Sequence, residues 1–224
     1  MSSLLLLNGS PRGASSNSMK MLSRVAEGWK SAAEPDARVE TLNLARRADF
    51  ERAVEAFAEA DTVLLGMPLY ADAMPSLVKA YIEELARYVG RSGNPRTAFL
   101  VQCGFSEAMH CRGVERYFEK LAARLGSPYA GTIVKGGGES LRSMPEEANK
   151  KLWARLVALG KSLRRDGRFD AELLPAVAGI ERFSAPAAAV LGAALVWPLP
   201  LLMWNGELKR NGALARRDAK PYAE

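Results

Sequence analysis

The chain has 224 residues, of which 48% are apolar and 25% are charged. At about 150 residues per domain, this length corresponds to one domain with an extension, and the composition excludes a disordered, collagen-like or coiled-coil protein. The net charge of +6 is uneven: residues 1–150 hold 19 basic and 18 acidic side chains, whereas residues 151–224 hold 12 and 7. A nearly neutral main part without a known nucleic-acid motif predicts no nucleic-acid partner.

Short apolar runs alternate with helical patterns over the first 165 residues. Runs typical of strands lie at 4–7, 38–44, 62–66, 97–102 and 129–134, and helical patterns lie at 17–33, 50–60, 77–88, 114–125 and 152–163. The first, third and fourth runs are apolar throughout, which is typical of parallel strands buried on both faces. Five such units predict a doubly wound α/β domain over residues 1–168, followed by a C-terminal extension over 169–224.

Cysteine and histidine are scarce. Cys103, Cys111 and His110 are too few for a zinc site or an iron–sulfur cluster, so we expect no metal. Cys103 has no general base beside it in the sequence, which favours a small buried residue over a nucleophile, and His110 is typical of a surface or capping residue. We therefore expect no catalytic side chain. The apolar run at 4–7 is too short for a signal peptide, which predicts a cytoplasmic protein.

The first loop after a predicted strand combines hydroxyls, an arginine and the start of a helix. Ser10, Ser16 and Ser18 can donate to phosphate oxygens, and Arg12 can add positive charge near the helix N-terminus. The loop is neither a Walker A nor a GxGxxG sequence. The alternative is a Ser/Asn-rich turn with a helix cap and no ligand.

The loops after the third, fourth and fifth strands have features of a ligand site. If the strand order is 2-1-3-4-5, the third loop faces the first at the point where ligands bind in such sheets. Pro68 and Leu69 could hold backbone against a flat ring, with Tyr70 near its edge, or this could be an exposed loop. Gly104 permits close approach of backbone to a ligand, and 136–138 is either a ligand wall or a turn that needs positive φ.

Two motifs carry a resemblance to a known family. Gly9-Ser10-Pro11-Arg12 with Ser16-Asn17-Ser18, and Pro68-Leu69-Tyr70 followed by Met74-Pro75 and Lys79, resemble the flavodoxin-like NAD(P)H-dependent FMN oxidoreductases over residues 3–165. That family includes FMN reductases, quinone reductases and iron–sulfur flavoproteins, although the cluster cysteines of the last group are absent here. The resemblance implies a flavodoxin-like five-stranded parallel sheet of order 2-1-3-4-5.

The resemblance also implies the cofactor and the residues that hold it. The FMN phosphate would lie on Ser10, Arg12, Ser16, Asn17 and Ser18, the isoalloxazine on Pro68, Leu69 and Tyr70, and its other side on Gly104 and Phe105.

The activity implied is transfer of electrons from NADH or NADPH, through FMN, to a quinone, a flavin or a similar small-molecule acceptor, in a homodimer or other homo-oligomer. The alternative is an FMN-binding electron carrier or redox-responsive interaction protein without NAD(P)H turnover. A nucleotide hydrolase is disfavoured because no Walker lysine and no acid–histidine pair is found.

No residue between Phe183 and Gly206 is charged. We expect a helix over Ala187–Trp197, packed on the core or on a second subunit. Peripheral membrane contact through 183–206, with quinone as the acceptor, is a second interpretation. A membrane span is disfavoured because Pro186, Pro198 and Pro200 interrupt the segment.

Overall fold

The computed structural model describes residues 2–32, 34–196 and 199–219. The chain divides into two compact units, Met1–Arg182 and Phe183–Glu224. Within the described ranges, no helix is both long enough and apolar enough to cross a membrane.

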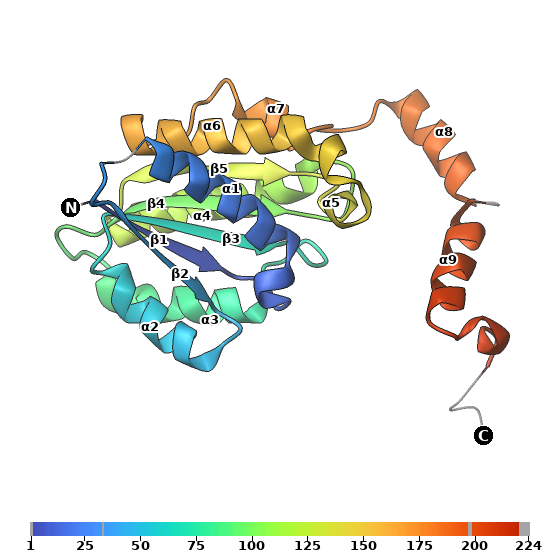
Figure 1. Ribbon diagram of the computed structural model, residues 1–224, viewed down its shortest axis with the longest axis horizontal. Helices are drawn as coiled ribbons and strands as arrows, with labels where there is room; N and C mark the ends of the chain where they lie inside the picture. Colours follow the sequence, from blue (N-terminus) through green and yellow to red (C-terminus); the bar gives the residue numbers. More distant parts are fainter. Residues whose placement is uncertain (1, 33, 197–198, 220–224) are drawn as a thin grey trace. The chain divides into compact units, whose positions relative to one another are not determined.

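The first unit is built on a five-stranded sheet (Figure 1). Its strands are β1 (Ser3–Asn8), β2 (Arg38–Asn43), β3 (Thr62–Pro68), β4 (Arg96–Gln102) and β5 (Tyr129–Lys135). All neighbours pair in parallel, and the order is β2-β1-β3-β4-β5. The predicted fold class and strand order are thus confirmed, and the order reverses beside β1.

Helices cover both faces of the sheet. One face packs against α1 (Asn17–Ser31), α6 (Lys150–Asp166) and α7 (Leu174–Ala178), and the other against α2 (Arg47–Phe57), α3 (Ser76–Glu84) and α4 (Arg112–Leu125) (Figure 1). Because side chains of a strand alternate in direction, Leu4 and Leu6 join the first core and Leu5 and Leu7 the second. The shorter helical pieces are α5 (Ser140–Ser143) and 3₁₀ turns at Gly13–Ser15, Leu85–Tyr88, Ala108–Cys111, Glu146–Asn149 and Leu214–Arg216.

Two glycines let α1 and α6 approach to backbone contact. A Cβ atom on Gly160 would lie 2.0 Å from the carbonyl oxygen of Val25, and one on Gly28 would lie 1.9 Å from that of Val157. No side chain fits at these distances, so the helix crossing depends on glycine at both positions. This contact fixes α1, whose N-terminus lies at the carboxyl end of β1.

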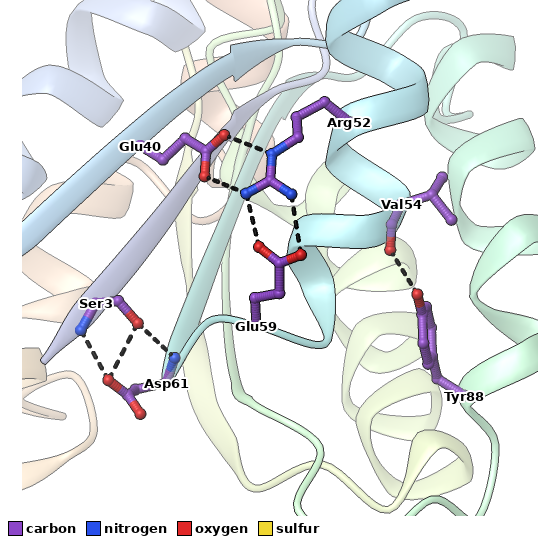
Figure 2. A network of polar contacts seen from close by, with 7 residues as sticks. All are labelled: Ser3, Glu40, Arg52, Val54, Glu59, Asp61 and Tyr88. Carbon is purple, nitrogen blue, oxygen red and sulfur yellow. Dashed lines mark hydrogen bonds and ion pairs between the residues drawn. The ribbon is translucent and has the colours of Figure 1, made fainter.

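A polar network ties the opposite, amino-terminal end of the sheet together (Figure 2). The backbone N–H of Ser3 donates to the Asp61 carboxylate at 2.8 Å, and the backbone N–H of Asp61 donates to the Ser3 hydroxyl at 2.9 Å. Arg52 of α2 donates to both Glu40 of β2 and Glu59, with distances between 2.7 and 3.1 Å. These contacts link β1 to β3 and β2 to α2.

The first unit extends past residue 168, where we placed the end of the domain. Phe169, Val177 and Ala178 are buried against the core, and the backbone N–H of Gly136 donates to the Ala178 carbonyl at 3.1 Å. Residues 169–182 therefore belong with the sheet, because its α1/α6 face is completed by them.

The second unit contains α8 (Ala185–Val196) and α9 (Leu199–Arg210). The helix expected over Ala187–Trp197 corresponds to α8, whereas Trp197 and Pro198 lie outside the described residues. The second helix, α9, is not expected from the prolines of this segment, yet Pro200 occupies its first turn, where proline is tolerated.

Candidate functional site

A cavity of about 170 Å³ lies at the carboxyl ends of β1, β3 and β4. Eight of the ten residues predicted from the resemblance line it: Ser10, Arg12, Ser16, Asn17, Pro68, Leu69, Tyr70 and Gly104. Gln102, Cys103 and Glu139 complete the lining. A larger hollow of about 460 Å³ beside Ser2 and Arg96 lies at the amino ends of the strands, whereas open α/β sheets bind ligands at the carboxyl ends.

Asn8, the last residue of β1, organises the first loop. Its side-chain amide donates to the Gly13 carbonyl at 2.7 Å and to Asn43 Oδ1 at 2.8 Å. Its Oδ1 accepts from the Ser10 backbone N–H at 3.2 Å and from the Ser16 hydroxyl at 3.4 Å. Because Asn8 is fully buried, these bonds hold both ends of the loop to the end of the sheet.

The N-terminus of α1 opens into the cavity. Ser16 caps the helix, since its hydroxyl accepts from the Met19 backbone N–H at 3.1 Å. The Asn17 side chain donates to the Gly138 carbonyl at 2.9 Å, and the Ser18 hydroxyl accepts from Gln102 at 3.5 Å. These three side chains therefore shape the loop, and first-turn N–H groups, which have no partner within a helix, are the donors suited to an anion.

Arg12 provides a positive charge at the edge of the cavity. Its guanidinium lies 3.5 Å from the Glu139 carboxylate, and both side chains are about half exposed. An exposed ion pair of this kind is weak. An anionic ligand could therefore replace Glu139 as the partner of Arg12.

The loop after β3 forms an apolar wall that ends in a tight turn. The backbone N–H of Leu69 donates to the Gln102 carbonyl at 2.7 Å, which continues the pairing of β3 with β4. Tyr70 and Ala73 exchange two backbone hydrogen bonds of 2.9 Å across the turn, and Ala71 and Asp72 have φ of 46° and 61°. Two left-handed residues that are not glycine store strain next to Tyr70, which lines the cavity and is 47% exposed.

Two of the predicted residues lie apart from the cavity lining. Ser18 is fully buried one position further into α1, and Phe105 is 55% exposed. The Phe105 ring stacks on His110 with centroids 4.4 Å apart, while His110 Nδ1 lies 3.2 Å from Asp72 Oδ1. Phe105 thus connects the loop after β4 to the turn after β3.

The glycines at 136–138 serve as a turn and as packing. Gly137 has a φ of 69°, and a Cβ atom on Gly138 would lie 1.9 Å from Gln102 Oε1. The backbone N–H of Gly138 donates to the Cys103 carbonyl at 2.7 Å. The positive φ confirms the interpretation as a turn, and the contacts place this turn against the loop after β4.

Cys103 and Cys111 are buried and in contact with each other. A hydrogen bond from the Cys111 thiol is the main cause that holds the pKa of Cys103 below its ordinary value, and the same bond with burial raises the pKa of Cys111. Cys103 lines the cavity, so the pair lies directly beneath it. Among the described residues, no group of three or more His, Cys, Asp or Glu side chains is arranged to hold a metal ion.

A family model described as a flavodoxin-like fold matches residues 2–100. Together with the strand order, this match identifies the fold. The chain has a flavodoxin-like fold. No curated protein matches its sequence significantly.

Solved structures share the flavodoxin-like fold at low identity. An FMN-dependent NADH-azoreductase from Bacillus anthracis in complex with FMN is 18% identical, with a TM-score of 0.56 over 74% of this chain and 100% of that one. An NAD(P)H:quinone oxidoreductase from Methanothermobacter marburgensis is 16% identical, with a TM-score of 0.54 over 74% of this chain and 98% of that one. An NADPH-quinone reductase from P. pentosaceus is 15% identical, with a TM-score of 0.52 over 74% and 99%.

Four residues outside the predicted binding set belong to the candidate site: Gln102, Cys103 and Glu139 line the cavity, and Asn8 anchors its first loop. Asn8 and Gln102 are the last residues of β1 and β4, so a polar residue at the end of an apolar strand is the signal that could have found them. Glu139 has no such signal, because its partner Arg12 is 127 positions away in the sequence.

Proposed function

We propose that this protein is an FMN-dependent NAD(P)H oxidoreductase that passes electrons to a quinone, a flavin or a similar small-molecule acceptor. The observation that supports this most is the meeting of two chemically different walls in one cavity. The α1 N-terminus with Ser10 and Arg12 suits a phosphate, and Pro68, Leu69 and Tyr70 suit a flat apolar ring.

FMN fits this donor set. Ser10 and the first turn of α1 would hold its phosphate, Arg12 would neutralise part of the charge, and the loop after β3 would contact its ring. Bound FMN supplies the redox chemistry, by accepting a hydride from reduced nicotinamide and passing electrons on. A cavity of about 170 Å³ encloses only part of a ligand as large as FMN, so the rest of a bound FMN would lie outside it.

The chain's own residues would bind and orient rather than exchange protons. Tyr70, which lines the cavity and is 47% exposed, could cover a ring, whereas Phe105 next to Gly104 is 55% exposed and stacks on His110. The named neighbours, an FMN-dependent azoreductase and quinone oxidoreductases, support the proposed reaction class. NADPH as donor, a homodimer and a cytoplasmic location stay predictions.

The test begins with the purified full-length protein and added FMN. We expect FMN to bind, NADH or NADPH to bleach the bound flavin without oxygen, and a quinone to restore its colour. Arg12→Ala should weaken FMN binding by about tenfold, because it removes a charge-assisted contact. Arg47→Ala, which removes an equal charge from an exposed pair with Glu51, should leave binding unchanged.

Two results would count against the proposal. A protein that does not bind FMN even after reconstitution refutes the cofactor. Bound flavin that neither NADH nor NADPH reduces refutes the reductase and favours the alternative, an FMN-binding electron carrier or redox-responsive interaction protein.

A further inference from the structure

The second unit exposes large apolar side chains. Val190 of α8 is 71% exposed, and Leu202, Met203 and Trp204 of α9 are 64%, 67% and 62% exposed. No charged residue occurs from Phe183 to Gly206. Large apolar side chains that are exposed on neighbouring helices, rather than scattered singly, indicate an interaction site.

The apolar side chains of α8 and α9 are not confined to one stripe. Every residue of α8 (APAAAVLGAALV) is apolar or glycine. In α9, four consecutive residues (201–204) are exposed, and consecutive helical residues point about 100° apart. A groove in a protein partner buries one face of an amphipathic helix, whereas lipid can surround a helix that is apolar all round.

Basic residues follow the apolar segment. Lys209, Arg210, Arg216 and Arg217 come within 14 positions of Trp204, together with two acidic residues, Glu207 and Asp218. Arg210 pairs with Glu207 at 2.7 Å and Arg217 with Asp218 at 3.2 Å, so the described segment keeps a positive excess. This excess complements anionic headgroups, and tryptophan prefers the boundary between lipid tails and water.

Each helix is too short to cross the hydrocarbon core. Twelve residues span about 18 Å, compared with a core of about 30 Å. We propose that α8, α9 and the basic residues between 209 and 217 bind the surface of an anionic bilayer, with the apolar side chains inserted below the headgroups at the boundary with the lipid tails. This proposal does not depend on the proposed function, because it concerns the second unit alone.

The test is sedimentation of the full-length protein with vesicles. We expect the protein to sediment with phosphatidylcholine vesicles that contain one quarter phosphatidylglycerol, and to a lesser extent with phosphatidylcholine alone. The double variant Leu202→Glu/Met203→Glu should lower binding by at least about tenfold, since it places two charges in the apolar surface. The matched control Met144→Glu/Ile180→Glu changes two exposed apolar residues of the first unit and should bind as the parent does.

Charge reversal tests the headgroup contact separately. Arg216→Glu/Arg217→Glu should lower binding to the anionic vesicles by about tenfold or more. Arg46→Glu/Arg47→Glu, an adjacent exposed pair in the first unit, should have no effect. Circular dichroism melting of each variant checks that the first unit is still folded.

Three outcomes would overturn the proposal. The first is a parent protein that stays in the supernatant with both vesicle types. The second is a glutamate variant of α9 that sediments as the parent does. The third is a parent protein that does not bind vesicles and is a dimer in light scattering, while the Leu202→Glu/Met203→Glu variant is a monomer. That result would show that the apolar surface binds a second copy of the chain. FMN binding, measured on the same preparation, reports independently on the proposed function.

Discussion

Asn8→Ala should destabilise the first loop, because the Asn8 side chain holds both ends of that loop to the sheet. Asn8 makes two donated bonds of 2.7 and 2.8 Å and accepts two longer ones of 3.2 and 3.4 Å. At about 1 kcal/mol net for each bond, and less for the long ones, the loss is about 2–4 kcal/mol of unfolding free energy. With a urea dependence of about 2 kcal/mol per molar, the midpoint of unfolding should fall by about 1–2 M.

The same variant should weaken FMN binding by at least about tenfold, because the loop that presents Ser10 and the α1 N-terminus loses its anchor. Asn43→Ala is the control: it removes only the 2.8 Å bond and should cost about 1 kcal/mol, with little effect on FMN. Equal urea midpoints for Asn8→Ala and the parent would refute the reasoning about the loop. Lower stability with unchanged FMN affinity would refute only its link to the ligand.

Three further outcomes follow from particular residues. Ala71→Gly should raise unfolding free energy by about 0.5–1 kcal/mol in urea titrations, since relief of left-handed strain exceeds the entropy cost of glycine; a loss of stability would contradict the strain. Gly160→Ala should lower the unfolding free energy by about 2 kcal/mol or more, because the new Cβ atom would clash with the backbone of α1. The control is Gly113→Ala in α4, which should raise the unfolding free energy by up to about 1 kcal/mol because its Cβ atom would meet nothing within 4 Å. The rate of Cys103 alkylation, measured by mass spectrometry, should reach half its maximum below pH 8.5, which is about the pKa of a free cysteine, because the lowered pKa of Cys103 lets the thiolate form at a lower pH. Cys111→Ala should raise the pH of this midpoint. An unchanged midpoint in the variant would contradict the contact between the two thiols.

The elements that the sequence predicts are those with one dominant physical cause. The central residues of β1, β3 and β4 are apolar because both faces of the sheet are covered, and the bounds of these strands agree with the predicted runs to within about two residues. The helices α1, α4 and α6 follow from apolar residues at helical spacing. The local sequence pattern is enough to predict these elements, because the residues that form the pattern are the ones that become buried in the core.

Other features depend on contacts that no local pattern contains. Phe169 and Val177 belong to the first unit because they cover the sheet, although the alternation of strands and helices ends before them. Pro200, interpreted from the sequence as a break, lies in the first turn of α9, where its missing N–H costs nothing. Glu139 reaches Arg12 only because the sheet order brings their loops together.

The candidate site shows the same division. Ser10, Arg12 and the loop after β3 could be predicted because the carboxyl ends of β1 and β3 must meet in this strand order. The hydrogen bonds that Ser16, Asn17 and Ser18 make within the protein could not be predicted from the sequence. Their partners, Asn8, Gly138 and Gln102, come close only in the folded structure. The side chains of this motif therefore mainly hold the loop in shape, and the groups left to contact a ligand are mainly backbone N–H groups.

The uneven charge of the chain can now be assigned to two different kinds of recognition. At the cavity, the positive charge of Arg12 is balanced by the Glu139 carboxylate 3.5 Å away. An anion would therefore be recognised by the geometry of the N–H donors rather than by a net positive charge. From Glu207 to Asp218, four basic and two acidic residues follow the uncharged run, and the proposed membrane contact would use their positive excess and the apolar side chains without a fixed geometry. Hydrogen-bond donors act only at contact, whereas exposed charges act over about 8–10 Å at physiological salt, so the basic excess of the second unit is consistent with the extended anionic surface that we propose.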